Sequence, residues 1–318
     1  MKLIIQIPCF NEEESLPVTL GDLPREVAGF DSVEWLIVDD GSQDRTVAVA
    51  KEGGVDHVVR LPQNGGLSRA FSAGISECLR LGADIIVNTD ADNQYNAEDI
   101  PLLTEPILSG KAEFVIGERP IASIKHFSPI KKLLQKWGSA VVRSISRTDV
   151  RDAPSGFRAI SRDAAMRLNV FSKYTYTLET IIQAGQEGMA VLSVPIRVNG
   201  KTRPSRLVKN LGSYVKRSIL TMFRVFVIYR PMRFFGSLAA LVFFPGFLLG
   251  LRFLVYYLIG EGDGHIQSVI LSALLMGSGL LLAIVAVIAD LISVNRRLLQ
   301  QIQWQMRKLE DKVEEKKS

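Results

Sequence analysis

Cysteine and histidine are scarce in this sequence. Its 318 residues include two cysteines, Cys9 and Cys78, and three histidines, His57, His126 and His265. Two cysteines cannot build a disulfide framework, and no cysteine or histidine cluster has the spacing of a zinc site. We therefore expect both cysteines to pack in the interior and the three histidines to have structural roles.

Glycine-rich nucleotide-binding loops are also missing. A dinucleotide-dependent oxidoreductase needs the pattern G-x-G-x-x-G after its first strand, but here the first strand runs into PCFNEEES, which has no glycine. A Walker loop is absent too. The N-terminal apolar run, MKLIIQIP, is too short for a signal peptide, so it predicts a first strand and a cytosolic N-terminal region.

Two long segments in the C-terminal third carry no charge, in a chain that is 47% hydrophobic. Phe234–Leu251 has 18 uncharged residues, an apolar run resumes after Arg252, and Ile266–Ala289 has 24 uncharged residues. Each segment is long enough to cross about 30 Å of hydrocarbon. Lysine and arginine flank the pair, so the positive-inside rule predicts a hairpin with both ends in the cytosol. Arg252 either snorkels to the far interface or pairs inside an oligomer.

Acidic residues are absent from Arg197–Arg233, which holds ten of the basic residues of a chain with net charge +5. Within this segment, Leu207–Ile228 repeats apolar residues at helical spacing. A basic amphipathic helix of this kind is typical of an anionic membrane surface, and a solvated basic face is the alternative. We therefore expect the basic residues of this segment to bind a membrane surface, and we expect no nucleic-acid partner.

The C-terminal tail shows a heptad pattern. Its members, spaced alternately by three and four residues, are Ile292, Asn295, Leu299, Ile302, Met306, Leu309 and Val313. This is the spacing of a coiled-coil seam, in which a polar residue such as Asn295 fixes the register. We expect the tail to make the protein a homo-oligomer, and a single amphipathic helix lying on the membrane is the alternative.

Strand-like and helix-like segments alternate from residue 1 to about residue 120. The predicted strands are Leu3–Ile7, Trp35–Val38, His57–Leu61, Asp84–Val87 and Glu113–Ile116. Alternation with helices predicts a mostly parallel α/β sheet, in which ligands bind at the carboxyl ends of the strands. A helix near Ile130–Ser146, a short strand in SGFRAIS and an edge strand at Val191–Val198 are expected to follow.

Acidic side chains follow two of these predicted strands. Asp90 and Asp92 come after one strand, with two amide residues directly behind them, and Asp39-Asp40 comes after another. Two carboxylates at i and i+2 suit Mg²⁺, which completes its ligand shell with substrate phosphates. Asp39 and Asp40 could accept hydrogen bonds from a nucleobase or a ribose, although Asp40 could also be only a turn residue.

Six motifs together resemble the family 2 glycosyltransferases with a GT-A fold: IPCFNEEESL, VDDGSQDRT, NGGLSRAFSAGI, NTDADNQ, IGER and SGFRAISR. Two apolar segments after them make the chain similar to the polyprenyl-phosphate glycosyltransferases, which include dolichyl-phosphate mannose synthase and bacterial undecaprenyl-phosphate glucosyltransferase. The resemblance implies a GT-A catalytic domain followed by an interfacial helix and a transmembrane hairpin. The expected boundaries are 1–204 for the GT-A domain, 205–232 for the interface helices, 233–290 for the hairpin (about 234–259 and 266–289) and 291–318 for the tail.

The resemblance also implies roles for individual residues. The nucleoside pocket is expected to use Pro8, Asn11, Glu12, Asp39, Asp40 and Asp90. The catalytic set is Asp90, Asp92, Gln94, Arg119 and Asp152, with Asp92 the more direct ligand of Mg²⁺ or Mn²⁺. The phosphate and acceptor side is expected to use Arg119, Ser155, Arg158, Arg203 and Arg206. Gly65, Gly66 and Arg69 open a helix whose N-terminus could face the donor diphosphate, and a plain strand–helix connection is the alternative.

The expected reaction transfers one sugar, with inversion, from a nucleotide sugar to a polyprenyl phosphate. A hydroxyl acceptor needs a general base, whereas a lipid phosphate is already ionised. Glu179 is the candidate base if one is used, and otherwise a helix residue that orients Arg158 or the sugar. A UDP-sugar is the favoured donor, with GDP-mannose possible. The rival functions are a transferase for diacylglycerol or a glycan, and a scaffold that binds nucleotide sugar without turnover; the processive motif Q-x-x-R-W is absent.

Overall fold

The computed structural model describes residues 1–120, 129–170, 176–200, 220, 223–224, 226–260 and 266–315. The chain divides into two compact units. Met1–Ser218 with Gln303–Ser318 forms the sheet unit, and Ile219–Ile302 forms the helical unit. Arg203, Arg206, His126, His265 and most of the predicted interface helix lie outside the described residues.

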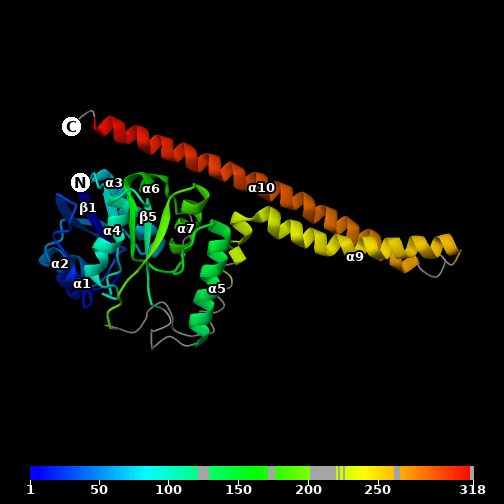
Figure 1. Ribbon diagram of the computed structural model, residues 1–318, viewed down its shortest axis with the longest axis horizontal. Helices are drawn as coiled ribbons and strands as arrows, with labels where there is room; N and C mark the ends of the chain where they lie inside the picture. The colour runs from blue at the N-terminus through cyan, green and yellow to red at the C-terminus, as the bar shows by residue number, and fades with distance from the viewer. Residues whose placement is uncertain are drawn as a thin grey trace. The chain divides into compact units, whose positions relative to one another are not determined.

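A seven-stranded sheet organises the sheet unit (Figure 1). Its strands are β1 (Lys2–Cys9), β2 (Ser32–Asp39), β3 (His57–Arg60), β4 (Ile85–Asn88), β5 (Phe114–Glu118), β6 (Arg158–Ser161) and β7 (Val191–Pro195). The order is β3-β2-β1-β4-β6-β5-β7, and only β6 runs antiparallel to its neighbours. The predicted strands and the mostly parallel sheet are therefore confirmed. The edge strand ends at Pro195, earlier than expected.

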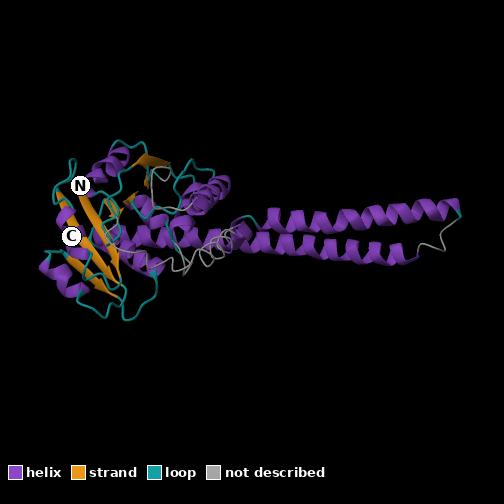
Figure 2. Ribbon diagram, turned by 90° about the horizontal axis from the view of Figure 1, so that it is seen from below, coloured by secondary structure: helices purple, strands orange, loops and turns teal. Residues whose placement is uncertain are grey.

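Helices cover both faces of this sheet (Figure 2). Those of the sheet unit are α1 (Leu16–Asp22), α2 (Thr46–Glu52), α3 (Leu67–Arg80), α4 (Ile100–Leu108), α5 (Pro129–Ser146), α6 (Arg162–Arg167) and α7 (Thr177–Gln186), with a 3₁₀ turn at Ala97–Asp99. On β1, Leu3, Ile5 and Ile7 join the core cluster on one face, while Gln6 faces α3. Burial on both faces explains why the strands read as continuous apolar runs. Cys9 and Cys78 are both buried, as expected.

The helical unit contains α9 (Pro231–Ile259) and most of α10 (Ile266–Glu315), and both helices are long and apolar enough to cross a membrane. Small residues bring them together. A Cβ on Gly246 would lie 2.7 Å from the Cβ of Leu275, and the Ser272 hydroxyl donates a hydrogen bond to the Gly246 carbonyl at 2.7 Å. Close backbone approach of this kind is typical of membrane helices.

The heptad residues of the tail lie on α10, because this helix continues without a break past the predicted boundary at residue 290. Their side chains are mostly exposed in the single chain: Ile292, Leu299, Ile302, Met306 and Leu309. Ser293 and Gln300, on another side of the helix, are buried. The apolar seam is therefore not used in packing within the described part of this chain.

Candidate functional site

The loops after β1 and β2 are joined by hydrogen bonds at the carboxyl end of the sheet. The Asn11 backbone N–H donates to the Ser42 hydroxyl at 2.9 Å, and the Asn11 side-chain oxygen accepts from the Gln43 N–H at 2.9 Å. The Glu12 N–H donates to the Thr46 hydroxyl at 2.8 Å. Because β1 lies beside β2 and β4, Pro8, Asn11 and Glu12 come to the same edge as the acidic strand ends.

Asp90 is the least satisfied carboxylate at this edge. It is half-buried, and among the described residues it makes no hydrogen bond or ion pair. Burial raises the pKa of Asp90 to about 7, with Asp92 adding to the rise and Arg119 opposing it. Asp92 is also half-buried, and its carboxylate accepts a hydrogen bond from the Gln94 N–H at 3.2 Å. The two carboxylates thus leave a local excess of negative charge, which a cation would relieve.

A glycine makes room for the Asp90 side chain. A Cβ on Gly156 would lie 3.0 and 3.1 Å from the two carboxylate oxygens of Asp90, and 3.1 Å from the Tyr176 hydroxyl. The Gly156 N–H donates to the Tyr95 hydroxyl at 2.9 Å, and its carbonyl accepts from the Asn88 side chain at 2.7 Å. The SGFR loop (Ser155–Arg158) therefore abuts the loop Asp90–Gln94, which we name the acidic loop.

Three residues of this arrangement were missed at the sequence level: Asn88, Tyr95 and Tyr176. Asn88 links them, because its side-chain nitrogen also donates to the Tyr176 hydroxyl at 3.0 Å. Burial raises the pKa of both tyrosines, so both stay protonated at neutral pH. In the sequence, only position points to the two tyrosines: Tyr95 directly follows Gln94, and Tyr176 lies in the motif YTYTLET.

Arg119 is held in a fixed orientation by Asp152. The guanidinium Nε and Nη2 donate to the two carboxylate oxygens of Asp152 at 2.6 and 3.0 Å. Both side chains are buried, and a two-point contact of this kind fixes geometry as well as charge. Asp152 therefore acts on the site through Arg119, whose positive charge reaches Asp90.

Arg158 differs from its expected role on the phosphate side. Its side chain is completely buried, and its guanidinium donates to the carbonyls of Ser155 at 2.7 Å and Ala153 at 3.0 Å and to the Thr180 hydroxyl at 2.6 Å. In this position its guanidinium donors are used by groups of its own loop and of α7, so Arg158 supports the SGFR loop. The Ser155 hydroxyl is buried and has no hydrogen-bond partner among the described residues.

Glu179 lies on α7 next to the residue that binds Arg158. It is buried, in the first turn of the helix. The described hydrogen bond from α7 to the Arg158 guanidinium uses the neighbouring Thr180. The two expectations for Glu179, a base or an orienting residue, both remain predictions.

Asp40 caps a helix. Its carboxylate oxygens accept hydrogen bonds from the Gly65 and Gly66 N–H groups, each at 2.8 Å, at the N-terminus of α3. A carboxylate therefore already occupies the positive end of this helix, which favours the plain strand–helix connection over a diphosphate site. Arg69, in the first turn, is exposed, and its side chain folds back over Gly65.

Asp39 is the better candidate for a nucleoside contact. One of its buried carboxylate oxygens accepts from the Ser42 N–H at 2.9 Å. The other lies 3.4 Å from the Arg60 guanidinium and has no hydrogen bond within the described structure. An acceptor of this kind suits the N–H of a nucleobase.

A cavity of about 340 Å³ opens between the first two loops, lined by Asn11, Glu13, Glu14, Gln43 and Asp44. Three of these five residues are acidic, so the cavity is unsuited to a diphosphate. Over the described ranges, no group of three histidine, cysteine or acidic residues gathers as a metal site. Asp90 and Asp92 therefore fit an ion that takes two protein carboxylates and draws its other ligands from a bound phosphate.

Comparison with known proteins agrees with this geometry. Residues 4–168 match the model of glycosyl transferase family 2. The chain is 29% identical to polyprenol monophosphomannose synthase of Mycolicibacterium smegmatis, over 70% of this chain and 85% of the relative. It is 30% identical to UDP-N-acetylglucosamine–dolichyl-phosphate N-acetylglucosaminyltransferase of Methanococcus voltae, over 60% of this chain and 83% of the relative.

A solved structure shares the fold. Glucosyl-3-phosphoglycerate synthase of Mycobacterium tuberculosis, in complex with Mn²⁺, uridine diphosphate and glucosyl-3-phosphoglycerate, superimposes with a TM-score of 0.53 at 19% identity, over 70% of this chain and 79% of that one. This likeness confirms the expected GT-A fold. The matched segment contains the acidic loop and the SGFR loop, and it covers about half of the sequence. The chain belongs to glycosyl transferase family 2.

Proposed function

We propose that this protein transfers one sugar, with inversion, from a nucleotide-sugar donor to a polyprenyl phosphate, giving a polyprenyl-phosphate-linked sugar. One observation carries the proposal: the carboxylate of Asp90, which has no partner in the described structure, lies next to Asp92 and within reach of the charge of Arg119, which Asp152 holds in place. This pairing suits a reaction that brings two anionic groups together. Two membrane-length helices in the same chain suit a lipid acceptor.

The donor side would use the loops after β1, β2 and β4. The Asp39 oxygen that faces Arg60 and accepts no hydrogen bond in the described structure would accept from the nucleobase, while Pro8, Asn11 and Glu12 would line the nucleoside pocket. Asp92 and Asp90 would hold Mg²⁺ or Mn²⁺, which would neutralise the leaving diphosphate. Gln94, bonded through its backbone to Asp92, would contact the sugar.

The acceptor side needs positive charge more than it needs a base, because a lipid phosphate is ionised at neutral pH. Arg119 would pair with phosphate oxygens, and its two-point contact with Asp152 means that little reorganisation is needed. Ser155, with an unused buried hydroxyl, would contact the acceptor. Arg203 and Arg206, outside the described residues, would add charge.

A UDP-sugar is our preferred donor. One relative is named for UDP-N-acetylglucosamine and dolichyl phosphate, and the solved structure of the same fold holds uridine diphosphate with Mn²⁺. Another relative is named as a mannose transferase, which keeps GDP-mannose in the donor panel.

The membrane arrangement completes the proposal. α9 and the first part of α10 would form a hairpin with the sheet unit and both termini in the cytosol. α10 continues as one helix into the tail, so the tail would leave the bilayer along the helix axis, and its exposed seam would bind the tails of other copies. Shortening the chain after residue 290 should then lower the number of copies per oligomer in detergent, and an unchanged number of copies would reject tail-mediated assembly.

A transfer assay tests the proposed reaction. Full-length protein in detergent would receive Mn²⁺ or Mg²⁺, undecaprenyl phosphate and a panel of radiolabelled nucleotide sugars. We expect label in a lipid product, lost with a chelator or with Asp92→Ala. Donor binding without any lipid product would reject the polyprenyl phosphate acceptor and favour diacylglycerol or a glycan. Binding without transfer to any acceptor would favour the scaffold.

A further inference from the structure

A short segment after the last strand is bound to the acidic loop. We name Arg197, Val198 and Asn199 the 197–199 clamp. The Asn199 N–H donates to the Gln94 carbonyl at 2.9 Å, and its side-chain nitrogen donates to the Asn93 carbonyl at 3.1 Å and, less directly, to the Tyr95 carbonyl at 3.4 Å. Val198 forms an isolated antiparallel bridge with Tyr95. The clamp therefore touches the residues on either side of Gln94.

Arg197 fixes the other end of the clamp. Its backbone N–H donates to one carboxylate oxygen of Asp99 at 2.6 Å, and its Nε and Nη2 donate to the other at 2.9 and 2.7 Å. Asp99 is buried, and Glu98 accepts a further bond from Arg197 at 3.0 Å. Arg197 belongs by sequence to the basic segment expected at a membrane surface, but in the structure it pairs with carboxylates of its own unit.

The acidic loop contains a residue with a left-handed backbone conformation. Asn93, between Asp92 and Gln94, has a positive φ of 53°. Asparagine adopts this left-handed conformation more readily than other residues with a Cβ, and contacts around it select the conformation. Here the Asn93 side chain donates to Asp22 at 2.7 Å, and its carbonyl accepts from Asn199. This turn sets the directions in which Asp92 and Gln94 leave the backbone.

We propose that Arg197 and Asn199 are positioning residues for the metal–diphosphate site. They hold the turn at Asn93, so that the Asp92 carboxylate is fixed before a divalent cation and a nucleoside diphosphate arrive. The proposal rests on the proposed function, because that function supplies the ligand. It adds residues that lie about 100 positions along the chain from the carboxylate that they serve.

The test measures Mn²⁺ binding in the presence of UDP, by electron paramagnetic resonance on the full-length protein in detergent. Asn199→Ala removes the two side-chain hydrogen bonds to the acidic loop. Arg197→Ala removes the two guanidinium hydrogen bonds to Asp99. We expect each change to weaken Mn²⁺ affinity about 10–100-fold, the range typical when support of a metal ligand is lost. Arg197→Lys keeps the positive charge but cannot make both guanidinium hydrogen bonds to Asp99, so its Mn²⁺ affinity should lie between those of the wild type and Arg197→Ala.

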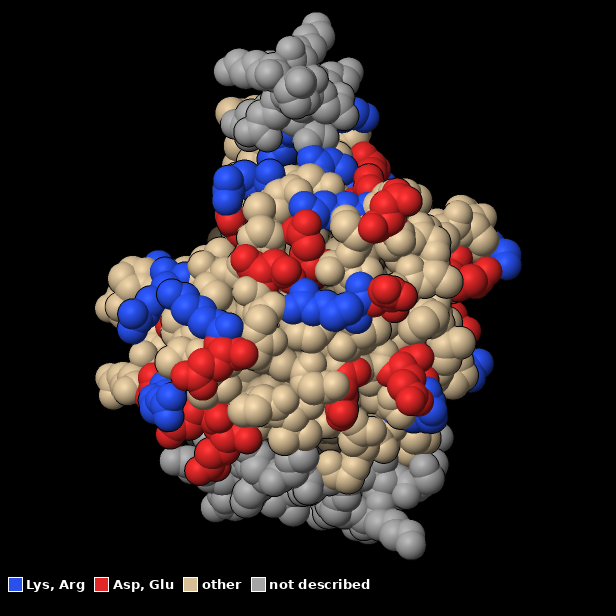
Figure 3. Space-filling view, turned by 90° about the vertical axis from the view of Figure 1, so that its left-hand side faces the viewer, with Lys and Arg blue, Asp and Glu red and all other residues tan. Residues whose placement is uncertain are grey.

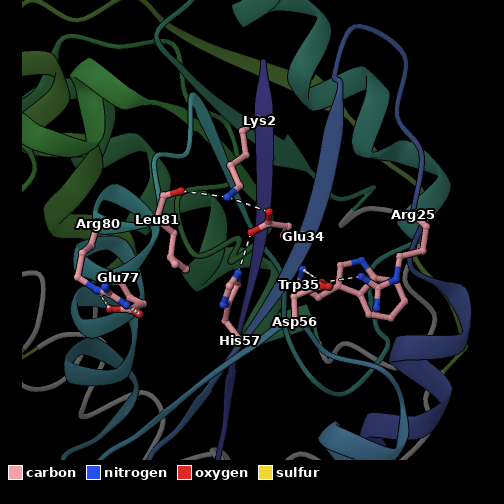
Figure 4. A network of polar contacts seen from close by, with 9 residues as sticks. All are labelled: Lys2, Arg25, Glu34, Trp35, Asp56, His57, Glu77, Arg80 and Leu81. Atoms are coloured by element: carbon pink, nitrogen blue, oxygen red, sulfur yellow. Dashed lines mark hydrogen bonds and ion pairs between the residues drawn. The ribbon is translucent and has the colours of Figure 1, made fainter. Parts of the chain in front are cut away.

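Arg25→Ala is the matched control, because Arg25 also bonds a carboxylate and a backbone carbonyl, at the other end of the sheet (Figure 4). It should lower the melting temperature with no change in Mn²⁺ affinity. Unchanged affinity in Asn199→Ala and Arg197→Ala, or an equal loss in Arg25→Ala, would overturn the positioning role. The wild-type result is read separately: a wild type that binds no Mn²⁺ with UDP would reject the proposed function together with this inference.

Hydrogen exchange on the ligand-free protein gives a second measurement. In Asn199→Ala, the backbone amides of residues 93–95 should exchange faster than in the wild type, while those of β1 should keep their rates. Equal rates at residues 93–95 would contradict the claim that the clamp holds the turn.

Discussion

The two ends of the sheet differ in whether their charged side chains are paired within the chain. At the amino ends of β1, β2 and β3, Glu34 pairs with Lys2 at 2.8 Å and with His57 at 2.7 Å (Figure 4). Nearby, Arg25 pairs with Asp56 at 2.6 Å and stacks on the Trp35 ring. At the carboxyl ends, Asp90 has no partner in the described structure. One end satisfies its charges within the chain, and the other leaves a carboxylate for a ligand.

This difference separates stability from function. A charge that is half-buried without a partner raises the free energy of the folded state, so its presence needs another reason. Figure 3 shows acidic and basic side chains interspersed over one side of the molecule, without a continuous patch of one sign on that face. The local imbalance at Asp90 and Asp92 is therefore a more specific signal than the net charge.

The largest expected effect comes from removing a carboxylate of the proposed metal site. Asp92→Asn should reduce sugar transfer by about 10²–10³-fold, the cost typical of losing a group that stabilises charge in the transition state. The melting temperature should be unchanged or slightly higher, because the repulsion between Asp92 and Asp90 is removed. Glu34→Gln, at the other end of the sheet, should keep the transfer rate and lower the melting temperature. Equal losses of activity in the two variants would remove the distinction between the ends.

A methyl group should disturb the same carboxylate indirectly. Gly156→Ala places a Cβ about 3 Å from both oxygens of Asp90, so this side chain or Tyr176 must move. We expect kcat/KM for transfer to fall about tenfold, less than the roughly 100-fold typical of a 1 Å displacement, because contacts of 3.0–3.1 Å are relieved by a smaller shift. The control is Gly21→Ala, which meets no atom within 4 Å. Full activity in Gly156→Ala would show that the position of Asp90 is not critical.

Metal affinity should depend on pH through Asp90, whose pKa is raised to about 7 by burial and by Asp92. A proton competes with the cation, so below pH 7 the Mn²⁺ affinity should fall about tenfold per pH unit. Titration of Mn²⁺ from pH 5 to pH 8 would measure this slope, which Asp90→Asn should remove. A pH-independent affinity would contradict the prediction.

The same pKa predicts the sign of a stability effect. An unfolded aspartic acid loses its proton near pH 4, whereas folded Asp90 keeps it until about pH 7. The folded state therefore binds more protons in this window, and the contribution of Asp90 to stability falls as the pH rises through it. Thermal unfolding of the ligand-free protein should show a smaller decrease over this range in Asp90→Asn than in the wild type.

The smallest effect is expected at the satisfied end. Arg25→Ala removes an ion pair whose side chains are 41% and 35% exposed, together with the stack on Trp35. Solvent screens such a pair, so the free energy of unfolding should fall by only about 1 kcal/mol. A shift in melting temperature with unchanged kcat and KM would support the contrast. A loss of transfer would show that the two ends are coupled.

The sequence was sufficient for features that depend on local pattern. Strand periodicity placed the parallel strands, uncharged runs placed α9 and the first part of α10, and the motif DADNQ placed Asp90 and Asp92 at a strand end. The contacts of Asp40 and Arg197 could not be predicted from the sequence, because their partners are distant along the chain. Asp40 binds Gly65 and Gly66, and Arg197 binds Asp99. No local pattern reports such pairs.

Arg158 illustrates a second limit. Its place in the motif SGFR and the resemblance to the family implied a phosphate contact. Burial is set by packing between β6, α7 and the loop before it, and this packing encloses the guanidinium against Thr180. Residue type and motif position alone do not distinguish an arginine that binds a ligand from one that supports a loop.

The most direct test of the contrast between the two ends is an experimental structure with Mn²⁺ and UDP bound. We predict that the ion lies within coordination distance of Asp92 or Asp90 and of the diphosphate, while the side chains of Lys2, Glu34 and His57 keep their contacts. Mn²⁺ and diphosphate bound away from both aspartates, for example at the cavity beside Glu13 and Asp44, would contradict the central claim.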